Sequence, residues 1–282
     1  MEAKLTLGAV YERTVPVSLE RVWENVHDWE HLPFLHSSSF LGIELEAAGD
    51  WGWRARVRVP GQGGSDSLLI DLRKEEGADV YHTRTLEGPG KGADTRVKLT
   101  PRGETATDVR VEFWLPVADD EQARALGRSL VTLYTQLWDE DESMMLGRQR
   151  AIDAASGAGA GPAPKDLAPF SLGPWETLGE RLPLLVSTEW GEYRVVESEA
   201  GFVAHPALCP HRGGPLHEAA IEDDFVVCPW HGYRFSLADG RAASGGNCRM
   251  KPPLRVERGP GDAAELVFDR RSRPHMRSEP VR

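Results

Sequence analysis

Two short segments of the sequence each place a cysteine close to a histidine, and this feature constrains the fold more than any other. Residues 209–216 read CPHRGGPL and residues 228–235 read CPWHGYRF. One residue separates Cys209 from His211, and two residues separate Cys228 from His231. Two such pairs supply four metal ligands, so a shared metal site would hold the two segments together. Zinc also accepts two cysteines and two histidines, but the paired ligands of zinc sites are normally separated by two to four residues.

The pattern and its surrounding residues resemble the Rieske [2Fe–2S] domain, in which two histidines replace two cysteines on one iron. The resemblance implies that the cluster ligands are Cys209, His211, Cys228 and His231. Loops that approach a cluster closely favour glycine, and the chain provides Gly213, Gly214 and Gly232. We therefore predict a [2Fe–2S] cluster in preference to zinc.

The type of Rieske centre also follows from the resemblance. High-potential respiratory members carry two further loop cysteines joined by a disulfide, and this chain has Gly214 and Trp230 at the matching positions. They also carry a serine just after the His-Gly of the second loop, where this chain has Tyr233. Fewer hydrogen bonds to the cluster sulfurs predict a potential toward the low end of the Rieske range of about −150 to +300 mV.

A second candidate metal site lies near the N-terminus, where the segment from Asn25 to His36 follows the pattern N-x2-D-x2-H-x4-H. Two imidazoles and one carboxylate from elsewhere form the facial triad of non-haem Fe(II) oxygenases. Beside a Rieske motif, the segment resembles the catalytic subunits of Rieske non-haem iron oxygenases. The resemblance implies that His31 and His36 bind Fe(II) and that Asn25 and Asp28 are catalytic residues. It also implies that Asp28 accepts a hydrogen bond from an iron ligand and bridges to a Rieske histidine, either His211 or His231.

The resembling family takes its third iron ligand from an aspartate on a long helix, and the candidates here lie in WDEDESMML, residues 138–146. Asp141 falls on the helix face that carries the apolar stripe Leu130, Tyr134, Leu137 and Met145. A carboxylate on a core-facing stripe needs compensation, which a metal ion supplies. We assign Asp141 as the ligand, with Glu140 and Glu142 as alternatives, and we expect Asp139 to face solvent.

The remaining metal-binding residue types lack partners at ligand spacing. Cys248 is predicted to be a small apolar filler. The other histidines are predicted to be surface residues or structural residues with satisfied hydrogen bonds: His27, His82, His205, His217 and His275.

A stretch rich in alanine, glycine and proline, residues 151–174, divides the chain because it contains few large side chains to bury. We predict a catalytic domain over residues 1–153, a linker over 154–172, a Rieske domain over 173–270 and a tail over 271–282. This order is inverted relative to the resembling oxygenases, in which the Rieske domain comes first.

The N-terminal part is expected to be an α+β domain. A strand is predicted over Lys4–Val15, a helix after the N-cap Ser18, and a long helix over Asp119–Ile152. Six alternating segments between the helices indicate an antiparallel sheet: FLGIELEA, WGWRARVRV, SLLIDLRKE, DVYHTRTLE, TRVKLTP and TDVRVEFWLP. One helix must cover the apolar face of such a sheet. By resemblance, this is a START-like helix-grip fold.

The C-terminal part is expected to be all-β. Short strands are predicted over Leu184–Ser187, Tyr193–Glu197, Gly201–His205 and Phe225–Cys228. The fold class is therefore α+β, with a START-like domain followed by an all-β Rieske domain.

Composition limits the class of protein further. The chain has 33 basic and 44 acidic residues among 282 and a formal charge of −11, which argues against binding to nucleic acid or to an anionic membrane. No apolar run approaches the ~20 residues of a membrane span, and MEAKLTLGAV has no signal-type apolar core. Three cysteines provide no disulfide framework. We therefore expect a cytoplasmic protein in a reducing compartment.

The motifs together predict an oxygenase. An NAD(P)H-dependent reductase or a ferredoxin would reduce the cluster, which passes electrons to Fe(II), where O₂ is activated beside a small organic, apolar or aromatic substrate. The resemblance implies a homo-oligomer, with a trimer favoured. One alternative is an electron-transfer module fused to a START-like carrier of a hydrophobic ligand, without catalytic iron. Another is a regulatory ligand-binding protein whose cluster senses redox state.

Overall fold

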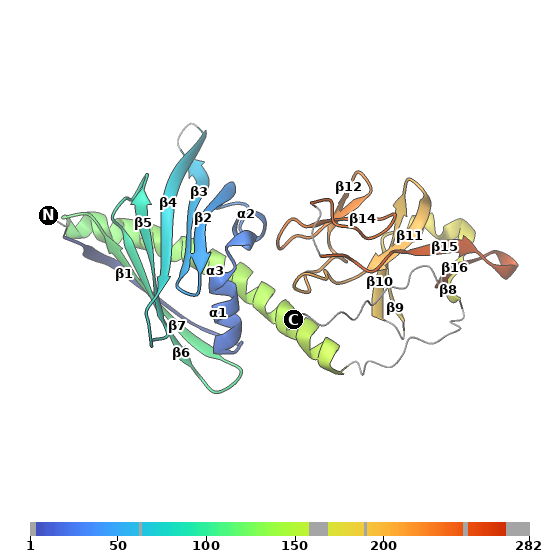
Figure 1. The fold of residues 1–282 in the computed structure, drawn as a ribbon, viewed down its shortest axis with the longest axis horizontal. Coiled ribbons are helices and arrows are strands. Elements are labelled where there is room, and N and C mark those ends of the chain that lie inside the picture. Colours follow the sequence, from blue (N-terminus) through green and yellow to red (C-terminus); the bar gives the residue numbers. More distant parts are fainter. Residues whose placement is uncertain (1–3, 62–63, 158–168, 189–190, 245–247, 269–282) are drawn as a thin grey trace, which may run out of the picture. The chain divides into compact units, whose positions relative to one another are not determined.

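The computed structural model describes residues 4–61, 64–157, 169–188, 191–244 and 248–268. The chain forms two compact units, residues 1–149 and residues 150–282 (Figure 1). Most of the expected linker, residues 158–168, lies outside the described residues, as do the expected tail and His275. Residues 154–157 continue the long helix of the first unit, and Phe170 begins a strand of the second.

A seven-stranded antiparallel sheet forms the basis of the N-terminal unit, in the order β1-β7-β6-β5-β4-β3-β2. The strands are β1 (Thr6–Val15), β2 (Gly42–Gly49), β3 (Gly52–Gly61), β4 (Gly64–Lys74), β5 (Val80–Glu87), β6 (Asp94–Pro101) and β7 (Thr107–Leu115). Strands β2 to β7 pair with their neighbours in sequence, as expected for hairpin connections. All six alternating segments therefore form strands, which confirms the sheet predicted from their alternation.

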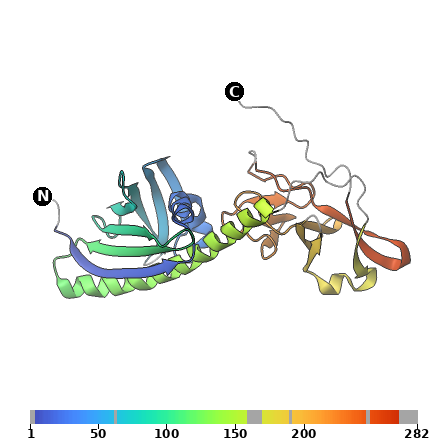
Figure 2. The same ribbon diagram turned by 90° about the horizontal axis from the view of Figure 1, so that it is seen from below.

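Four helical segments accompany the sheet: α1 (Leu19–His27), η1 (Trp29–His31), α2 (Leu32–Leu35) and α3 (Asp120–Gly157). The predicted N-cap of α1 is confirmed, because the Ser18 hydroxyl accepts a hydrogen bond of 3.3 Å from the backbone N–H of Arg21. The helix α3 ends at Gly157 rather than at Ile152, so its last turn includes alanines that we had assigned to the linker. Figure 2 shows α3 running along one face of the sheet.

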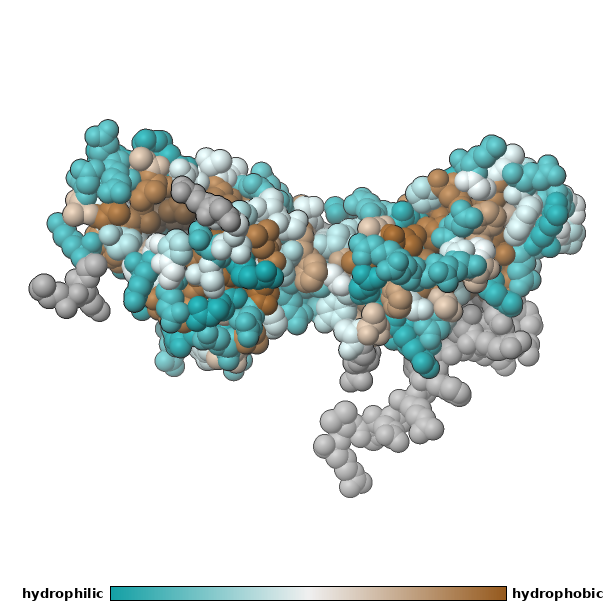
Figure 3. Space-filling model, turned by 90° about the horizontal axis from the view of Figure 1, so that it is seen from above, coloured by the Kyte–Doolittle hydropathy of each residue, from teal (hydrophilic) through white to brown (hydrophobic). Residues whose placement is uncertain are grey.

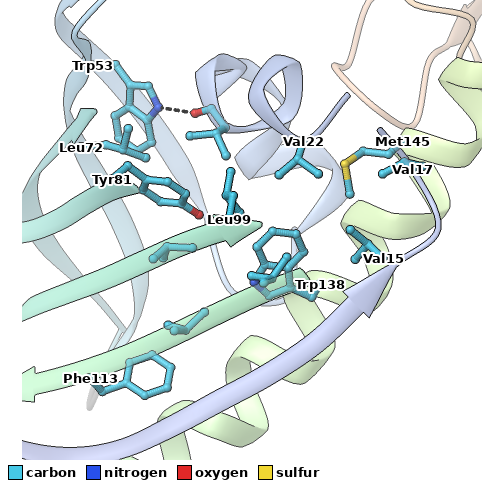
Figure 4. Close-up of a cluster of buried hydrophobic side chains, with 14 of the residues drawn as sticks. Val15, Val17, Val22, Trp53, Leu72, Tyr81, Leu99, Phe113, Trp138 and Met145 are labelled. Carbon is cyan, nitrogen blue, oxygen red and sulfur yellow. Dashed lines mark hydrogen bonds between the residues drawn. The ribbon is translucent and has the colours of Figure 1, made fainter. Parts of the chain in front are cut away.

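The main core fills the space between the sheet and the helices (Figure 4). Val15, Phe113 and Trp138 are buried there, and the indole N–H of Trp53 donates a hydrogen bond of 3.0 Å to the carbonyl of Val26. The helix α3 also approaches β1 closely, because a Cβ atom added at Gly127 would lie 2.4 Å from the backbone of Gly8. These contacts fix α3, and with it the acidic segment 139–142, against the sheet.

The described residues of the C-terminal unit form two sheets, which confirms the predicted all-β fold. Six strands pair in the order β8-β16-β15-β11-β10-β9, and three pair in the order β12-β13-β14. Their bounds are β8 (Phe170–Pro174), β9 (Leu184–Thr188), β10 (Gly191–Ser198), β11 (Gly201–Pro206), β12 (Ala220–Glu222), β13 (Phe225–Val227), β14 (Arg234–Ser236), β15 (Leu254–Arg258) and β16 (Ala263–Val267). Short 3₁₀ segments, η2 (Trp175–Thr177), η3 (Gly179–Arg181) and η4 (Pro260–Asp262), lie between strands.

Four strands of this unit correspond to predictions, and five do not. The predicted segments form β9, β10, β11 and β13, whereas β8, β12, β14, β15 and β16 were missed. Three-residue strands such as β12 and β14 are too short to show alternation. The strand β8 lies within the proline-rich stretch that we interpreted as linker.

No helix in the described parts of the chain combines the length and the apolar character needed to cross a bilayer.

Candidate metal centres

Four residues of the N-terminal motif are buried in the short segment that runs from the end of α1 to the residue after α2. Asn25 lies in α1, Asp28 follows the helix, His31 ends η1 and His36 follows α2. Their exposed fractions are 8%, 7%, 4% and 1% respectively. The backbone N–H of Asp28 donates a hydrogen bond of 3.0 Å to the carbonyl of Asn25, which ends α1 and turns the chain toward η1.

Two imidazoles from this segment meet a carboxylate from α3. One possible ligand atom from each of His31, His36 and Asp141 lies within 4.8 Å of the other two. The Asp141 Oδ1 atom is 3.4 Å from His31 Nε2 and 3.1 Å from His36 Nε2. The histidine rings are 5.1 Å apart at an angle of 72°. The structure therefore brings together the three residues that we predicted as iron ligands.

The other acidic residues of α3 occupy different places. The Glu140 Oε2 atom contacts His36 Nδ1 at 2.5 Å, on the ring nitrogen that does not face Asp141. Both Asp139 and Glu142 form ion pairs with Arg13, at 2.8 Å and 2.9 Å. The Asp139 side chain is 60% exposed, as expected for a residue facing solvent. Of the alternatives to Asp141, Glu140 thus supports a histidine and Glu142 points to Arg13.

The electrostatics of the triad favour an ionised carboxylate. Burial raises the pKa of Asp141, but hydrogen bonds from His31 and His36 outweigh burial and leave this pKa below its ordinary value. Burial lowers the pKa of His36, but the carboxylates of Asp141 and Glu140 raise this pKa above its ordinary value. The amide of Asn25 also donates a hydrogen bond of 3.0 Å to Asp141 Oδ1. An ionised carboxylate is the form that binds a metal.

One histidine ring nitrogen of the triad forms no hydrogen bond with any described residue. The Nδ1 atom of His31 is buried and has no hydrogen-bond partner there. The hydrogen bond that the resemblance implies from a ligand histidine to Asp28 is thus not formed at this nitrogen. Glu140 instead provides the carboxylate contact, to His36.

The triad forms part of the wall of a cavity of about 720 Å³ in the N-terminal unit. Asn25 and Asp28 also line the cavity, and most of the remaining lining is apolar, including Trp53, Leu72 and Leu130. Figure 3 shows hydrophobic residues gathered in a recessed area of the N-terminal unit. The volume lies within the range of about 300–1,000 Å³ that is typical of small-molecule sites.

The two cysteine–histidine loops of the C-terminal unit share one backbone pattern. The first loop follows β11, where Cys209 N–H donates to Gly214 O at 2.8 Å and Gly213 N–H donates to Cys209 O at 2.9 Å. The second loop joins β13 to β14, and there Cys228 pairs in the same way with Tyr233 and Gly232, at 2.8 Å and 2.9 Å. The φ angles of Gly213 and Gly232 are 79° and 65°, in the left-handed region that favours glycine.

The side chains of the two loops converge. The rings of His211 and His231 are 4.7 Å apart, and the cysteine side chains are buried. Hydrogen bonds from Cys209 and His231 lower the pKa of Cys228, which favours the thiolate that binds iron. A Cβ atom at Gly214 would lie 2.7 Å from Cys228 Sγ, so the loop leaves room for no side chain beside that sulfur. The donor set and this close approach fit a [2Fe–2S] cluster.

The residues expected to be structural occupy varied environments. Cys248 is half-buried, and the Nδ1 atoms of His27 and His217 lie 2.9 Å and 3.2 Å from backbone carbonyls. His82 lies between Asp94 and Glu75 at 3.1 Å and 2.6 Å.

His205 departs from the expectation of satisfied hydrogen bonds. It is fully buried, with Nδ1 2.9 Å from Pro206 O, but Nε2 has no partner within the described residues.

Comparison with known proteins identifies a family match in the C-terminal unit. The family model of the Rieske [2Fe-2S] domain matches residues 174–253. A human Rieske domain-containing protein is 53% identical over 36 residues, which is 11% of this chain and 23% of that protein. The chain thus matches about a quarter of that relative's length.

Solved structures similar to the N-terminal half include a START superfamily protein from Mycobacterium smegmatis and the Zhui aromatase/cyclase from Streptomyces sp. R1128. The first is 20% identical, with a TM-score of 0.42 over 49% of this chain and 99% of that one. The second is 15% identical, with a TM-score of 0.44 over 52% of this chain and 98% of that one.

The predicted fold class is confirmed, because an antiparallel sheet with the long helix α3 precedes an all-β unit. The Rieske domain in that second unit implies a [2Fe–2S] cluster.

Proposed function

We propose that the protein is a Rieske-type non-haem iron oxygenase that oxidises a small, largely apolar organic substrate. The observation that carries this proposal is the convergence of His31, His36 and Asp141 in the wall of an apolar cavity. Two imidazoles and one carboxylate are the ligand set of non-haem Fe(II) oxygenases. The chain also contains a Rieske domain, which supplies a route for electrons.

The donor set fits a mononuclear Fe(II). The Nε2 atoms of His31 and His36 would bind the metal with a carboxylate oxygen of Asp141, because these atoms already lie close together. When bound, Fe(II) with three protein ligands supplies open coordination positions for O₂ activation, and the cluster supplies electrons one at a time.

Neighbouring residues hold these ligands in position. Glu140 accepts a hydrogen bond from His36 Nδ1–H, which fixes the ring orientation and directs Nε2 toward Asp141. Glu140 is itself held by Gln136, whose amide lies 3.1 Å from Glu140 Oε1 and 2.8 Å from Ser38 Oγ. The Asn25 amide holds Asp141 Oδ1 from the other side. The apolar cavity excludes water from the reacting groups and accommodates the substrate.

The Rieske domain would provide electrons through its four ligands, Cys209, His211, Cys228 and His231. We propose that an NAD(P)H-dependent reductase or a ferredoxin in the cytoplasm reduces the cluster, and that the chain works as a homo-oligomer. Asp28 is proposed to couple the triad to a cluster histidine, His211 or His231. This role is compatible with the burial of Asp28 in the cavity wall.

A carrier of an apolar ligand is the main alternative, because the same cavity would serve it. Such a protein would need no iron at the triad. Binding of iron at His31, His36 and Asp141 therefore distinguishes the two functions.

Nitric oxide provides a direct test of an open Fe(II) position. Reduced protein loaded anaerobically with Fe(II) should give the EPR signal of an iron–nitrosyl centre, at about one per chain. The His36→Ala variant should lose this signal and retain the signal of the reduced cluster. A wild-type protein with a complete cluster and no nitrosyl signal would exclude the proposed function.

The role of Asp28 needs a separate experiment. Asp28→Ala and Asp28→Asn should retain both metal centres, but reoxidation of the reduced cluster by O₂ should slow at least about ten-fold. The measurement is stopped-flow absorbance with naphthalene as an apolar probe. Asp139→Asn, at an exposed carboxylate of the same charge, is the matched control. Wild-type reoxidation rates in both Asp28 variants would show that Asp28 is only structural.

A further inference from the structure

Four hydroxyl-bearing side chains line the sheet side of the cavity. Tyr81, Thr83 and Thr85 alternate along β5, so their side chains share the inner face of the sheet and line the cavity. Thr95 on β6 also lines the cavity and lies directly opposite Thr83 in the antiparallel register. We call these four residues the hydroxyl stripe. The triad comes from the helical side, so a ligand in the cavity meets the stripe on the sheet side.

Three hydroxyls of the stripe are available to a ligand. Within the described residues, no side-chain hydrogen bond engages Tyr81, Thr83 or Thr85. Burial raises the pKa of Tyr134 on α3, whereas the Thr95 hydroxyl acts to lower this pKa. Tyr81 is only 7% exposed, and Figure 4 shows it reaching from β5 into the space between the sheet and the helices. Because burial raises its pKa well above the ordinary value, the phenol stays protonated and can donate a hydrogen bond. Because Tyr81 lines the cavity, a ligand oxygen bound there would gain a hydrogen bond from its hydroxyl.

The charge of the cavity wall restricts the ligand further. No lysine or arginine is among the described residues that line the cavity. Its carboxylates are Asp141, which two imidazoles already compensate, and Asp28. In the iron-free protein, a carboxylate or sulfonate ligand would lose its hydration without gaining a lysine or arginine partner, which is unfavourable. The cavity is therefore suited to an uncharged molecule.

We propose that the cavity binds an uncharged, mainly apolar molecule with a carbonyl, ether or hydroxyl oxygen, which accepts a hydrogen bond from Tyr81. The stripe then orients the molecule, and its apolar part is directed toward the triad. The proposal deepens the proposed oxygenase function by naming its substrate class. Binding itself needs only the cavity, so binding is tested without iron at the triad.

Two fluorescent probes of similar aromatic size separate the possibilities in the full-length chain. Prodan is a neutral naphthyl ketone whose emission moves to longer wavelength when its carbonyl accepts a hydrogen bond, and anilinonaphthalene sulfonate is anionic. Titration should show one prodan site per chain, with the sulfonate at least about ten-fold weaker because its charge is unmatched. Equal or tighter binding of the sulfonate would overturn the proposal.

The Tyr81→Phe variant tests the hydrogen bond and keeps the ring that packs in the core. Prodan should bind about three- to ten-fold more weakly, as expected for one lost hydrogen bond, and its emission should move to shorter wavelength. Tyr11→Phe, on β1 and outside the cavity lining, is the matched control and should change neither quantity. Unchanged affinity and emission in Tyr81→Phe would refute the role of Tyr81.

The proposed oxygenase and the proposed ligand class can fail separately. The wild-type protein should bind prodan with similar affinity before and after the triad is loaded anaerobically with Fe(II). A wild-type protein that binds prodan but does not bind Fe(II) at the triad would support the ligand class and refute the oxygenase. Iron binding without prodan binding would refute the ligand class alone.

Discussion

The two candidate metal centres are held in place by different kinds of interaction. In the Rieske loops, backbone hydrogen bonds within each loop set the positions of Cys209 and Cys228. In the triad, Asp141 reaches the two histidines from a helix more than 100 residues away in sequence, and side chains hold it there. A site fixed by local backbone depends on the conformation of its loops. A site fixed by side chains depends on each contact between distant segments.

This difference determines how substitutions should act. A side chain that crowds a Rieske loop should remove the cluster completely, because backbone hydrogen bonds hold the loop and its cysteine in one position. A substitution at Glu140 should weaken the triad by degrees, because His31, His36 and Asp141 remain in place. Each of the following variants tests one side of the comparison.

The largest effect is expected for Gly214→Ala. The new methyl group would lie 2.7 Å from Cys228 Sγ, well inside normal contact distance, so it should prevent cluster assembly. The variant should resemble Cys228→Ser, with loss of inorganic sulfide and of Rieske-type absorption. Gly179→Ala, where the nearest heavy atom is 3.8 Å away, is the control and should keep a full cluster. A normal cluster in Gly214→Ala would contradict the loop geometry.

The second effect concerns His205, which lies on β11 just before the first Rieske loop. Burial lowers the pKa of His205 to about 4, so the folded state binds fewer protons than the unfolded state between about pH 6.5 and pH 4. The contribution of His205 to the free energy of unfolding is therefore fully present above pH 6.5. It declines as the pH falls from 6.5 to 4. The loss should reach about 3 kcal/mol for a shift of this size.

Urea unfolding of the full-length protein, followed by cluster absorption, measures the effect of His205. Other groups that titrate in this window contribute equally to the wild type and to His205→Leu. The difference in unfolding free energy between the two proteins should therefore change by about 3 kcal/mol between pH 7 and pH 4. A difference that is constant with pH would mean that His205 does not titrate as its burial implies.

A smaller effect is expected for Glu140→Gln. The amide keeps the shape of the side chain but removes the charge that supports His36 Nδ1, so Fe(II) at the triad should bind about 10- to 100-fold more weakly. Anaerobic Fe(II) titration measures this affinity. The nitrosyl EPR signal of the Fe(II) that the variant still binds at the triad should differ from that of the wild type. Glu142→Gln, whose carboxylate pairs with Arg13, should bind iron as the wild type does. Equal affinities in the two variants would mean that Glu140 is not a positioning residue.

Local sequence signals predicted the parts of this molecule that local structure determines. The Rieske motif was readable because both cysteine–histidine pairs lie within single loops, and the strands of the large sheet were readable from alternation. Assigning Asp141 required the apolar stripe of a helix, and the role of Glu140 emerged only from its contact with His36 across 104 residues. The hydroxyl stripe depends on the register between β5 and β6, which no short pattern encodes.

Iron and sulfide analysis of the purified protein tests the central claim that the chain carries two separate metal centres. The wild-type protein should contain about three irons and about two sulfides per chain. His31→Ala, His36→Ala and Asp141→Ala should each contain about two irons with unchanged sulfide and an unchanged cluster spectrum. Two irons per chain in the wild type, or three in all of these variants, would contradict the account.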